Sequence, residues 1–414
     1  MEELKAKYRQ RFYEELFGSC VPFWLRYGRD PEFGGVRNCL DRAGQVYSDD
    51  KSVWMQGRTA YTFSSLCNRF GKNEEYLSFA ESCLRFEKEH CIDPADGRMY
   101  FTVTRDGRPL RKRRYWFSET FYILANAEYY LATGDGEKLE EARKYFRFVL
   151  QMYRDPSSDP YRVTPKTIAA TRKMKSLAQP MILLNVTSVM RRADPANERE
   201  YAAVASELTR DIGNFYKPEL HALLENVTDR NEYLAEAAEG RVVNPGHDIE
   251  ASWFLLEEGL FRGDEKLVGF AKTVFDDAVA RGWDEEYGGI LYFRDVENKP
   301  VEAYEHDMKL WWPHNEAIIA SLSFYAATGE RKYKEWFEKV VGYAFPRFSD
   351  PEYGEWFGYL RRDGKPTEPP CKGHTYKGAF HVMRMLFKVL DIFDGYTSAG
   401  VEKRPFCGKE TGNI

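Results

Sequence analysis

A turn motif that recurs at a fixed interval is the feature of this sequence that most limits its fold. Its clear copies begin at Asp30, Asp93, Asp284 and Asp350. The intervals are 63, 191 and 66 residues, and 191 is about three such steps. Degraded copies stand near the two missing positions, at Asp155-Pro156 and Lys217-Pro218. Self-similarity at such a period predicts a repeat architecture, here of six units.

Each unit is predicted to contain two helices, the turn motif and a small β-hairpin. Glycines at 71, 134, 263 and 329 keep the same step and are typical of helix C-termini. After the turn, the segments 99–109, 291–296 and 356–366 alternate aromatic and polar residues, which indicates short hairpins. Apolar residues at helical spacing between these markers predict two helices in every unit, about twelve in all.

The two ends of the chain favour a closed ring over an open solenoid. The last helical segment begins near His381 and ends near Phe393 without a following partner helix. The first 28 residues supply one helix that has no preceding partner, so it completes the sixth pair. An open superhelix would need polar capping repeats at both ends. We therefore predict an all-α fold, an (α/α)6 barrel with short β-hairpins in the loops at one end. It is expected to form a single domain over 1–395, with a tail at 396–414.

Composition removes several classes of function. The net charge of −5 over 414 residues argues against nucleic acid or an anionic membrane as the partner. No apolar run approaches the ~18 residues of a membrane span, and the charged N-terminus does not resemble a signal peptide. The 7 cysteines are scattered without a Cys-x-x-Cys pair, which suits a reducing cytoplasm. Neither a P-loop nor a Gly-x-Gly-x-x-Gly motif is present, and no metal site is expected.

Polar and titratable residues recur near the start of the helices that are predicted to line the ring. The marker residues are Arg58, Glu119, Met181, His247, His314 and His381, at steps of 61, 62, 66, 67 and 67 residues. In a closed ring, one phase of the repeat becomes one end of the central funnel. The positive ends of the helix dipoles there favour developing oxyanions and a neutral imidazole.

His247 follows a Pro-Gly pair at a predicted helix start, where it is suited to act as a base. Glu250 is three residues later on the same helical face and is expected to orient its ring. His314 stands beside Trp311, Trp312 and Pro313, where substrate contact and simple packing are both open. Glu119, Glu316 and Trp312 are further candidates for substrate binding. The alternative for the two glutamates is that they are ordinary helix-start carboxylates, and for Trp312 that it is a core residue.

Several long motifs resemble the N-acylglucosamine 2-epimerase family, and the likeness runs from about residue 9 to residue 393. These motifs are Trp54-Met-Gln-Gly-Arg58, Asn244-Pro-Gly-His-Asp-Ile-Glu250, Trp311-Trp-Pro-His-Asn-Glu316, Asp350-Pro-Glu-Tyr-Gly354 and Tyr376-Lys-Gly-Ala-Phe-His381. The resemblance implies a cytoplasmic homodimer of (α/α)6 barrels with a role in sialic acid metabolism. It also implies that ATP acts as an activator that is not consumed. No consumed cofactor is implied.

The resemblance also assigns roles to residues. His247 and His381 match the family's two catalytic histidines, Arg58 and Glu316 match residues needed for activity, and Tyr376 matches a ring-facing position of the related disaccharide epimerases. The expected reaction interconverts N-acetyl-D-glucosamine and N-acetyl-D-mannosamine. After ring opening, one histidine would remove the proton at C2 and the other would return one to the opposite face.

Three alternatives remain open from the sequence. Cellobiose or mannobiose 2-epimerases and aldose–ketose isomerases are expected to share the barrel and both histidines. An inverting glycoside hydrolase would use two carboxylates, for which Glu119 and Glu316 are the candidates. A non-enzymatic interaction protein is the third, and the titratable funnel argues against it.

Overall fold

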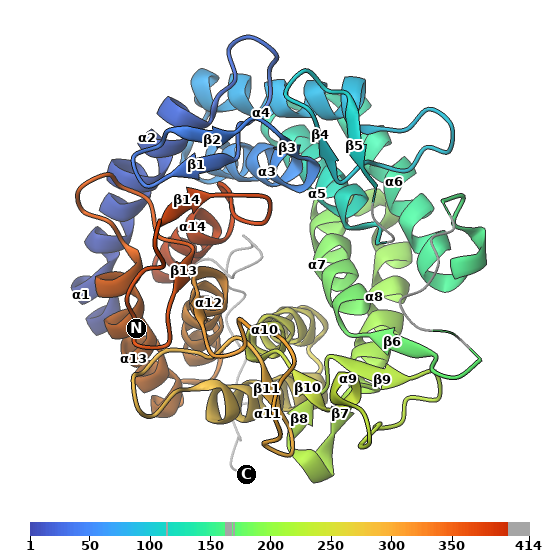
Figure 1. Cartoon of the computed structure of the whole chain (residues 1–414), viewed down its shortest axis with the longest axis vertical. Coiled ribbons are helices and arrows are strands. Elements are labelled where there is room, and N and C mark those ends of the chain that lie inside the picture. Colours follow the sequence, from blue (N-terminus) through green and yellow to red (C-terminus); the bar gives the residue numbers. More distant parts are fainter. Residues whose placement is uncertain (113–114, 162–167, 169, 396–414) are drawn as a thin grey trace, which may run out of the picture.

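The computed structural model describes residues 1–112, 115–161, 168 and 170–395, and it shows a ring of helices in two layers (Figure 1). The inner layer consists of α3 (Val53–Phe70), α5 (Phe117–Thr133), α7 (Ala178–Ala193), α10 (Pro245–Arg262), α12 (Trp311–Thr328) and α14 (His381–Phe393). The outer layer consists of α1 (Glu2–Glu14), α4 (Glu74–Phe86), α6 (Gly136–Arg154), α8 (Glu198–Gly213), α11 (Glu265–Gly282) and α13 (Arg331–Phe348). The predicted (α/α)6 barrel is confirmed.

The helix boundaries follow from local sequence. The inner helices α5, α10 and α12 end at glycines in the left-handed region, with φ of 78°, 64° and 72°, where a side chain would be strained. The outer helices α4, α6 and α11 then begin at Asn73, Asp135 and Asp264, whose side chains accept hydrogen bonds from first-turn N–H groups. Each Gly-to-cap connection is short, so consecutive helices lie antiparallel.

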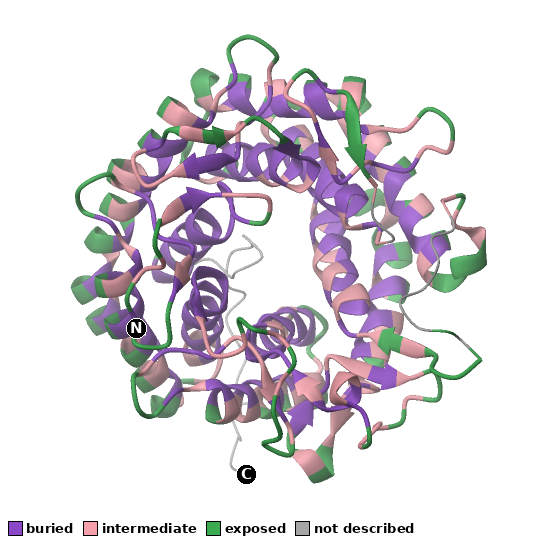
Figure 2. Ribbon diagram, in the orientation of Figure 1, coloured by how far each residue is buried: buried purple, intermediate pink, exposed green. Residues whose placement is uncertain are grey.

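The two layers differ in burial because only the outer one meets solvent on a broad face (Figure 2). In the inner helix α12 the first 14 residues, Trp311 to Phe324, are all buried. The outer helix α13 buries one stripe that includes Tyr333, Phe337 and Val341. A helix that is buried all round must satisfy any polar group it carries inside the protein.

Short helical segments lie outside the twelve barrel helices. The chain after α1 continues as π-helical turns at Glu15–Cys20 and Trp24–Gly28 around the short α2 (Val21–Phe23), and α4 ends in another at Glu87–Cys91. A single-turn helix, α9 (Ala238–Arg241), precedes α10. Within the described ranges, no helix combines the length and apolarity needed to cross a membrane.

Short strands at one end of the barrel connect neighbouring units. They are β1 (Cys39–Asp41), β2 (Val46–Ser48), β3 (Lys51–Ser52), β4 (Thr102–Val103), β5 (Pro109–Arg111), β6 (Met174–Ser176), β7 (Tyr216–Lys217), β8 (Ala222–Leu223), β9 (Asn226–Thr228), β10 (Val242–Val243), β11 (Arg294–Asp295), β12 (Lys309–Leu310), β13 (Tyr359–Leu360) and β14 (Cys371–Gly373).

The strand that precedes an inner helix pairs, antiparallel, with a strand of the next unit along the ring. These pairs are β3–β4, β6–β9, β10–β11, β12–β13 and β14–β1. Local hairpin pairs β1–β2, β4–β5 and β7–β8 are present as well. In the described part of the chain, the pairing therefore connects units at five of the six junctions, which the sequence did not reveal.

The aspartate that opens the repeated turn explains why the motif recurs. Its carboxylate accepts hydrogen bonds from backbone N–H groups of the turn, as Asp350 does from Glu352 at 3.1 Å. It also ion-pairs with a buried lysine that lies before the next inner helix. The pairs are Asp30–Lys51 at 3.0 Å, Asp284–Lys309 at 2.8 Å and Asp350–Lys372 at 3.1 Å.

An arginine from the following unit completes each of these clusters. Arg105 binds Asp30 at 2.9 Å, and Arg362 binds Asp284 at 3.0 Å. Arg42, in the first unit, binds Asp350 of the last unit at 2.7 Å. The same contact that joins adjacent units thus also joins the two ends of the chain.

Ring closure rests on three further contacts. Strand β14 pairs with β1, with Leu40 opposite Gly373. Helix α1 packs against α14, where the rings of Phe12 and Phe393 lie 6.3 Å apart. Arg9 forms a hydrogen-bonded ion pair with Asp394 at 2.7 Å. The N-terminal helix therefore fills the outer position beside α14, and the tail predicted at 396–414 lies outside the described residues.

Candidate active site

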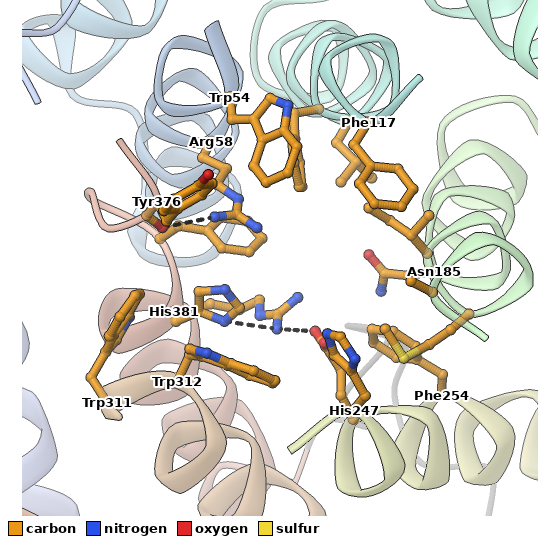
Figure 3. Close-up of a pocket in the computed structure, with 18 of the residues that line it drawn as sticks. Trp54, Arg58, Phe117, Asn185, His247, Phe254, Trp311, Trp312, Tyr376 and His381 are labelled. Carbon is orange, nitrogen blue, oxygen red and sulfur yellow. Dashed lines mark hydrogen bonds and ion pairs between the residues drawn. The ribbon is translucent and has the colours of Figure 1, made fainter. Parts of the chain in front are cut away.

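A cavity of about 280 Å³ opens among the first turns of the six inner helices (Figure 3). Every inner helix contributes to its lining. The structure brings six of the predicted site residues to this cavity: Arg58, His247, Glu250, Trp312, Tyr376 and His381. Its size is close to the lower end of the ~300–1,000 Å³ range of ligand pockets.

His247 is held at the start of α10 by two local features. Pro245 opens the helix, and the side chain of Asn244 accepts hydrogen bonds from the N–H groups of Gly246 and His247. The ring Nδ1 donates to the carboxylate of Glu225 at 2.9 Å. With its proton on Nδ1, the ring presents Nε2 for proton transfer.

Glu225 sets the charge of this histidine. Burial alone would lower the pKa of His247, but the negative charge and hydrogen bond of Glu225 outweigh it, so the pKa is raised above its ordinary value. The sequence predicts instead that the helix dipole holds this ring neutral. A full carboxylate charge at hydrogen-bond distance is stronger than the partial charge of a helix end, which is why that expectation is wrong.

His381 is the first residue of α14 and has the opposite electrostatic setting. Its Nδ1 donates to Oε1 of Glu316 at 2.9 Å. Burial, together with the positive charges of Arg58 and Arg384, lowers the pKa of His381 well below its ordinary value. Its imidazole is therefore neutral near pH 7, with the unprotonated Nε2 of a base.

Trp312 brings the two histidines into one site. Its ring centroid lies 5.1 Å from that of His247 and 6.0 Å from that of His381. The two imidazoles thus contact the same indole from different helices and border the same cavity (Figure 3).

Two carboxylates share one guanidinium below the histidines. Nη2 of Arg384 donates to Glu250 at 2.7 Å and to Glu316 at 2.6 Å, and Trp253 donates its indole N–H to Glu316 at 2.9 Å. Glu250 is therefore directed towards Arg384. The prediction that Glu250 orients His247 is wrong, because the opposite charge across the barrel attracts its carboxylate more than the imidazole one turn earlier.

Glu250, Glu316 and His381 are also the group whose ligand-type atoms lie close enough to hold a metal ion, within 4.8 Å of one another. The guanidinium of Arg384 already supplies the positive charge between both carboxylates. These side chains fit an arginine-centred network better than a metal site.

Arg58 is a half-buried cation with open hydrogen-bonding capacity. Its Nη1 donates to the backbone oxygen of Tyr376 at 3.2 Å, and its guanidinium lies over the rings of Phe121 and Phe380, 4.2 and 4.9 Å from their centroids. Burial and the nearby charge of Arg384 lower its pKa to about 9, so it stays charged at neutral pH. Within the described ranges, no carboxylate forms an ion pair with it. Such a cation suits an oxyanion of the substrate.

The structure places Glu119 and His314 away from the cavity lining, and their predicted substrate contacts are wrong. Glu119 accepts hydrogen bonds from Arg98 at 2.6 Å and from the N–H of Met99 at 2.8 Å. His314 accepts from the N–H of Ile290 at 2.9 Å and donates to the carbonyl of Leu310 at 2.6 Å. Both side chains satisfy the backbone that follows a repeated turn.

Gln56 has the same task in the first unit, where it accepts from the N–H of Val36 at 2.7 Å. The repeat period of these polar residues therefore has two origins. Some of these residues line the cavity, and the others form hydrogen bonds with the backbone after the turn motif.

Sequence reasoning missed three polar residues of the site. Glu225 precedes β9 in a loop, 22 residues before the histidine it binds. Arg384 lies one turn after His381, and this i, i+3 spacing was a usable signal. Asn185 lines the cavity from the second turn of α7, in the segment where only Met181 was marked.

Comparison with known proteins gives consistent results. The sequence model of a family described as N-acylglucosamine 2-epimerase (GlcNAc 2-epimerase) matches residues 34–383. The chain is 39% identical to N-acylglucosamine 2-epimerase of Bos taurus and 37% identical to that of Homo sapiens, in both cases over 93% of this chain and 90% of the relative. Among solved structures, cellobiose 2-epimerase from Bacillus thermoamylovorans has the same fold, with a TM-score of 0.80 at 20% identity over 94% of this chain and 99% of that one.

Proposed function

Because this chain belongs to the N-acylglucosamine 2-epimerase family, we propose that its cavity interconverts N-acetyl-D-glucosamine and N-acetyl-D-mannosamine by moving the proton at C2. The enzyme is a carbohydrate epimerase. One observation carries the assignment of roles: two histidines on non-adjacent inner helices contact one indole, and each is held by a glutamate at Nδ1.

The reaction needs an acidic C2 proton, which the closed sugar ring does not provide. In the open-chain aldehyde, loss of the C2 proton moves the C–H electron pair into a C1–C2 double bond and leaves negative charge on O1. Arg58 is placed to bind this oxyanion, since its charge is not neutralised by a carboxylate of the described chain. Tyr376 contributes the backbone oxygen that holds Arg58 in place.

The proton then has to return to the opposite face of C2. His381, neutral because of its burial, is the base for one epimer, and His247, whose pKa Glu225 raises, is the acid that donates from the other side. The reverse reaction exchanges the two roles. Each proton transfer contributes about 10²–10⁴-fold to the rate.

Glu316 and Glu250 support this chemistry without touching the reacting carbon. Glu316 keeps the proton of His381 on Nδ1, and Arg384 fixes both carboxylates. The indole ring of Trp312 packs against both imidazoles. The site is thus organised in advance of substrate binding.

The hydrolase alternative fits this geometry poorly. An inverting hydrolase needs one carboxylic acid and one free carboxylate about 6.5–9.5 Å apart on either side of the bond. Glu119 is fixed to Arg98, and Glu316 is bound by His381, Arg384 and Trp253. The disaccharide epimerases and the aldose–ketose isomerases remain the second candidate, because the same two histidines would serve them.

We further propose a cytoplasmic homodimer that acts in sialic acid metabolism, as the resemblance implies. The described cysteines are all free thiols, which suits a reducing compartment. The proposed activator, ATP, has no place in the cavity chemistry. Its role as an activator that is not consumed is proposed from the family resemblance alone.

A substrate screen tests the proposed function. Purified protein is incubated with N-acetylglucosamine, N-acetylmannosamine, mannose and cellobiose, with and without ATP, and the anomeric signals are followed by proton NMR. We expect interconversion of the two N-acetyl sugars from either side. Preferred epimerisation of cellobiose, formation of a ketose, or cleavage of the disaccharide would each overturn the assignment. Size-exclusion chromatography with light scattering measures the oligomeric state.

A further inference from the structure

The cavity has one wall that the proton chemistry does not use. It is formed by α5 and α7, and its described lining consists of Phe117, Phe121, Leu124, Ala178, Met181, Ile182 and Asn185. Figure 3 shows Asn185 and Phe117 on the side of the cavity that lies across from His381. We call this surface the acyl wall.

Asn185 is the only polar side chain among the described residues of the acyl wall. It is half-buried, and no residue in the described ranges hydrogen-bonds its carboxamide. A carboxamide offers both an N–H donor and a carbonyl acceptor. It is therefore able to pair with a second amide through two hydrogen bonds at once.

The position of C2 limits where its nitrogen substituent can lie. The reacting carbon has to be within hydrogen-bond reach of both imidazoles, and O1 is bound by Arg58. When C2 becomes planar in the enolate, the histidines occupy its two faces. The nitrogen and C3 then lie in the plane between the imidazoles, directed away from O1.

Two groups compete for the acyl wall, the N-acyl group and the chain from C3 to C6. The sugar chain carries several hydroxyls, each of which costs free energy if it is buried without a partner. The acyl wall provides one carboxamide and otherwise apolar surface. An N-acyl group has one amide, which can pair with the carboxamide, and an alkyl end, which can pack on the apolar surface.

We propose that the acyl wall is the N-acyl subsite, in which Asn185 pairs with the substrate amide and Met181, Ile182 and Leu124 enclose its alkyl end. This inference rests on the proposed function and deepens it. It makes Asn185 a substrate-recognition residue and Met181 the residue that limits the length of the acyl chain. The hydroxyl chain then extends towards the mouth near Tyr292 and Tyr376.

The test measures kcat and KM for a series of N-acyl mannosamines with acetyl, propanoyl and butanoyl groups. Met181→Ala should raise the ratio of butanoyl to acetyl kcat/KM by about 10-fold, since one methylene in an apolar pocket changes it by roughly 10- to 200-fold. Asn185→Ala should lower kcat/KM for the acetyl sugar by roughly 10- to 100-fold, mainly through KM, because the substrate amide loses its partner.

Matched controls separate recognition from folding. Met190→Ala removes a buried methionine from the same helix, and Asn126→Ala removes a buried asparagine from α5, where it donates to the carbonyl of Tyr122. Neither residue lines the cavity. Both controls should keep the wild-type acyl preference, and thermal unfolding of all variants is recorded.

Two results would overturn the subsite. One is an unchanged acyl preference in Met181→Ala. The other is a loss in Asn185→Ala no larger than that in Asn126→Ala. A wild-type protein that epimerises no N-acyl sugar would instead overturn the proposed function, and the subsite with it.

Discussion

His247 and His381 differ in charge because different groups lie behind them. Against the effect of burial, Glu225 and then Glu250 raise the pKa of His247. For His381, burial and the positive charges of Arg58 and Arg384 lower the pKa. The pair therefore holds one proton over the pH range between the two pKa values. A two-histidine epimerase needs this singly protonated state in either direction.

Replacement of Glu225 by glutamine tests this division of roles. The variant keeps a hydrogen-bond acceptor for Nδ1 but loses the charge, so the pKa of His247 should fall. The protonated acid is then lost at a lower pH than in the wild type. We expect the alkaline limb of the pH–rate profile to move to lower pH and kcat at neutral pH to fall by about 10- to 100-fold.

The control for this change is Glu219→Gln, an exposed glutamate in the preceding loop. Its pH profile should equal that of the wild type. If the alkaline limb of Glu225→Gln stays in place, His247 is not the group that titrates there, and the assignment of the acid fails.

The sequence predicted the two histidines and Arg58, yet the equal spacing behind that prediction was only approximate. Arg58 is the sixth residue of α3, His247 the third of α10 and His381 the first of α14. Each residue of offset turns a side chain by ~100° about the helix axis. Helix position does not separate the two groups, because Glu119 is the third residue of α5, as His247 is of α10. Glu119 and His314 instead bind backbone N–H groups that follow a repeated turn, a contact that the sequence pattern does not reveal.

At the level of elements, the repeated turn acts as a clamp between units. Asp350 stabilises the contact between units, because its almost fully buried carboxylate forms ion pairs with Lys372 and Arg42. Helices were predictable from their caps, glycines and apolar spacing. The pairing of strands between units was not, because strands of two or three residues carry too little pattern to show a partner.

Replacement of Asp350 by asparagine should keep the turn, since the amide oxygen still accepts the N–H of Glu352. It leaves Lys372 as a buried charge with its carboxylate lost, which costs about 3–5 kcal/mol of unfolding free energy. Urea unfolding at pH 7 measures the change. Asp106→Asn, at an exposed hairpin tip, is the control and should lie within about 0.5 kcal/mol of the wild type.

Asp350 also makes the free energy of unfolding depend on pH. Hydrogen bonds and charges from Arg42 and Lys372 overcome burial and lower the pKa of Asp350 to about 2, against ~3.9 in an unfolded chain. Its contribution is complete above the unfolded pKa and disappears as pH falls from about 4 to about 2. The Asp350→Asn variant should lose less stability over that interval. An equal slope for both proteins would contradict this origin.

For the whole molecule, ring closure makes the position of the chain ends unimportant to the fold. Lys5 and Arg9 both bind Asp394, so the N-terminal helix lies beside the last described residues. A circular permutant that joins residue 395 to residue 2 through a short Gly/Ser linker, with new ends at Gly134, should keep every contact between units. Short linkers of this kind add little strain.

We expect this permutant to fold with helical circular dichroism like the wild type and to retain epimerase activity within about 10-fold, in line with the tolerance of domains whose ends adjoin. An open solenoid would break apart in such a rearrangement. A permutant that stays unfolded would therefore contradict the closed ring.

The most direct test of the two-histidine site is the fate of the C2 proton in deuterium oxide, followed by NMR for the wild type, His247→Ala and His381→Ala. The account predicts that each epimer formed by the wild type carries deuterium at C2 from the first turnover. Each single variant should cease to epimerise yet still exchange the C2 proton of one epimer, a different one in each case. Product that retains its original proton, or two variants that exchange the same epimer, would contradict it.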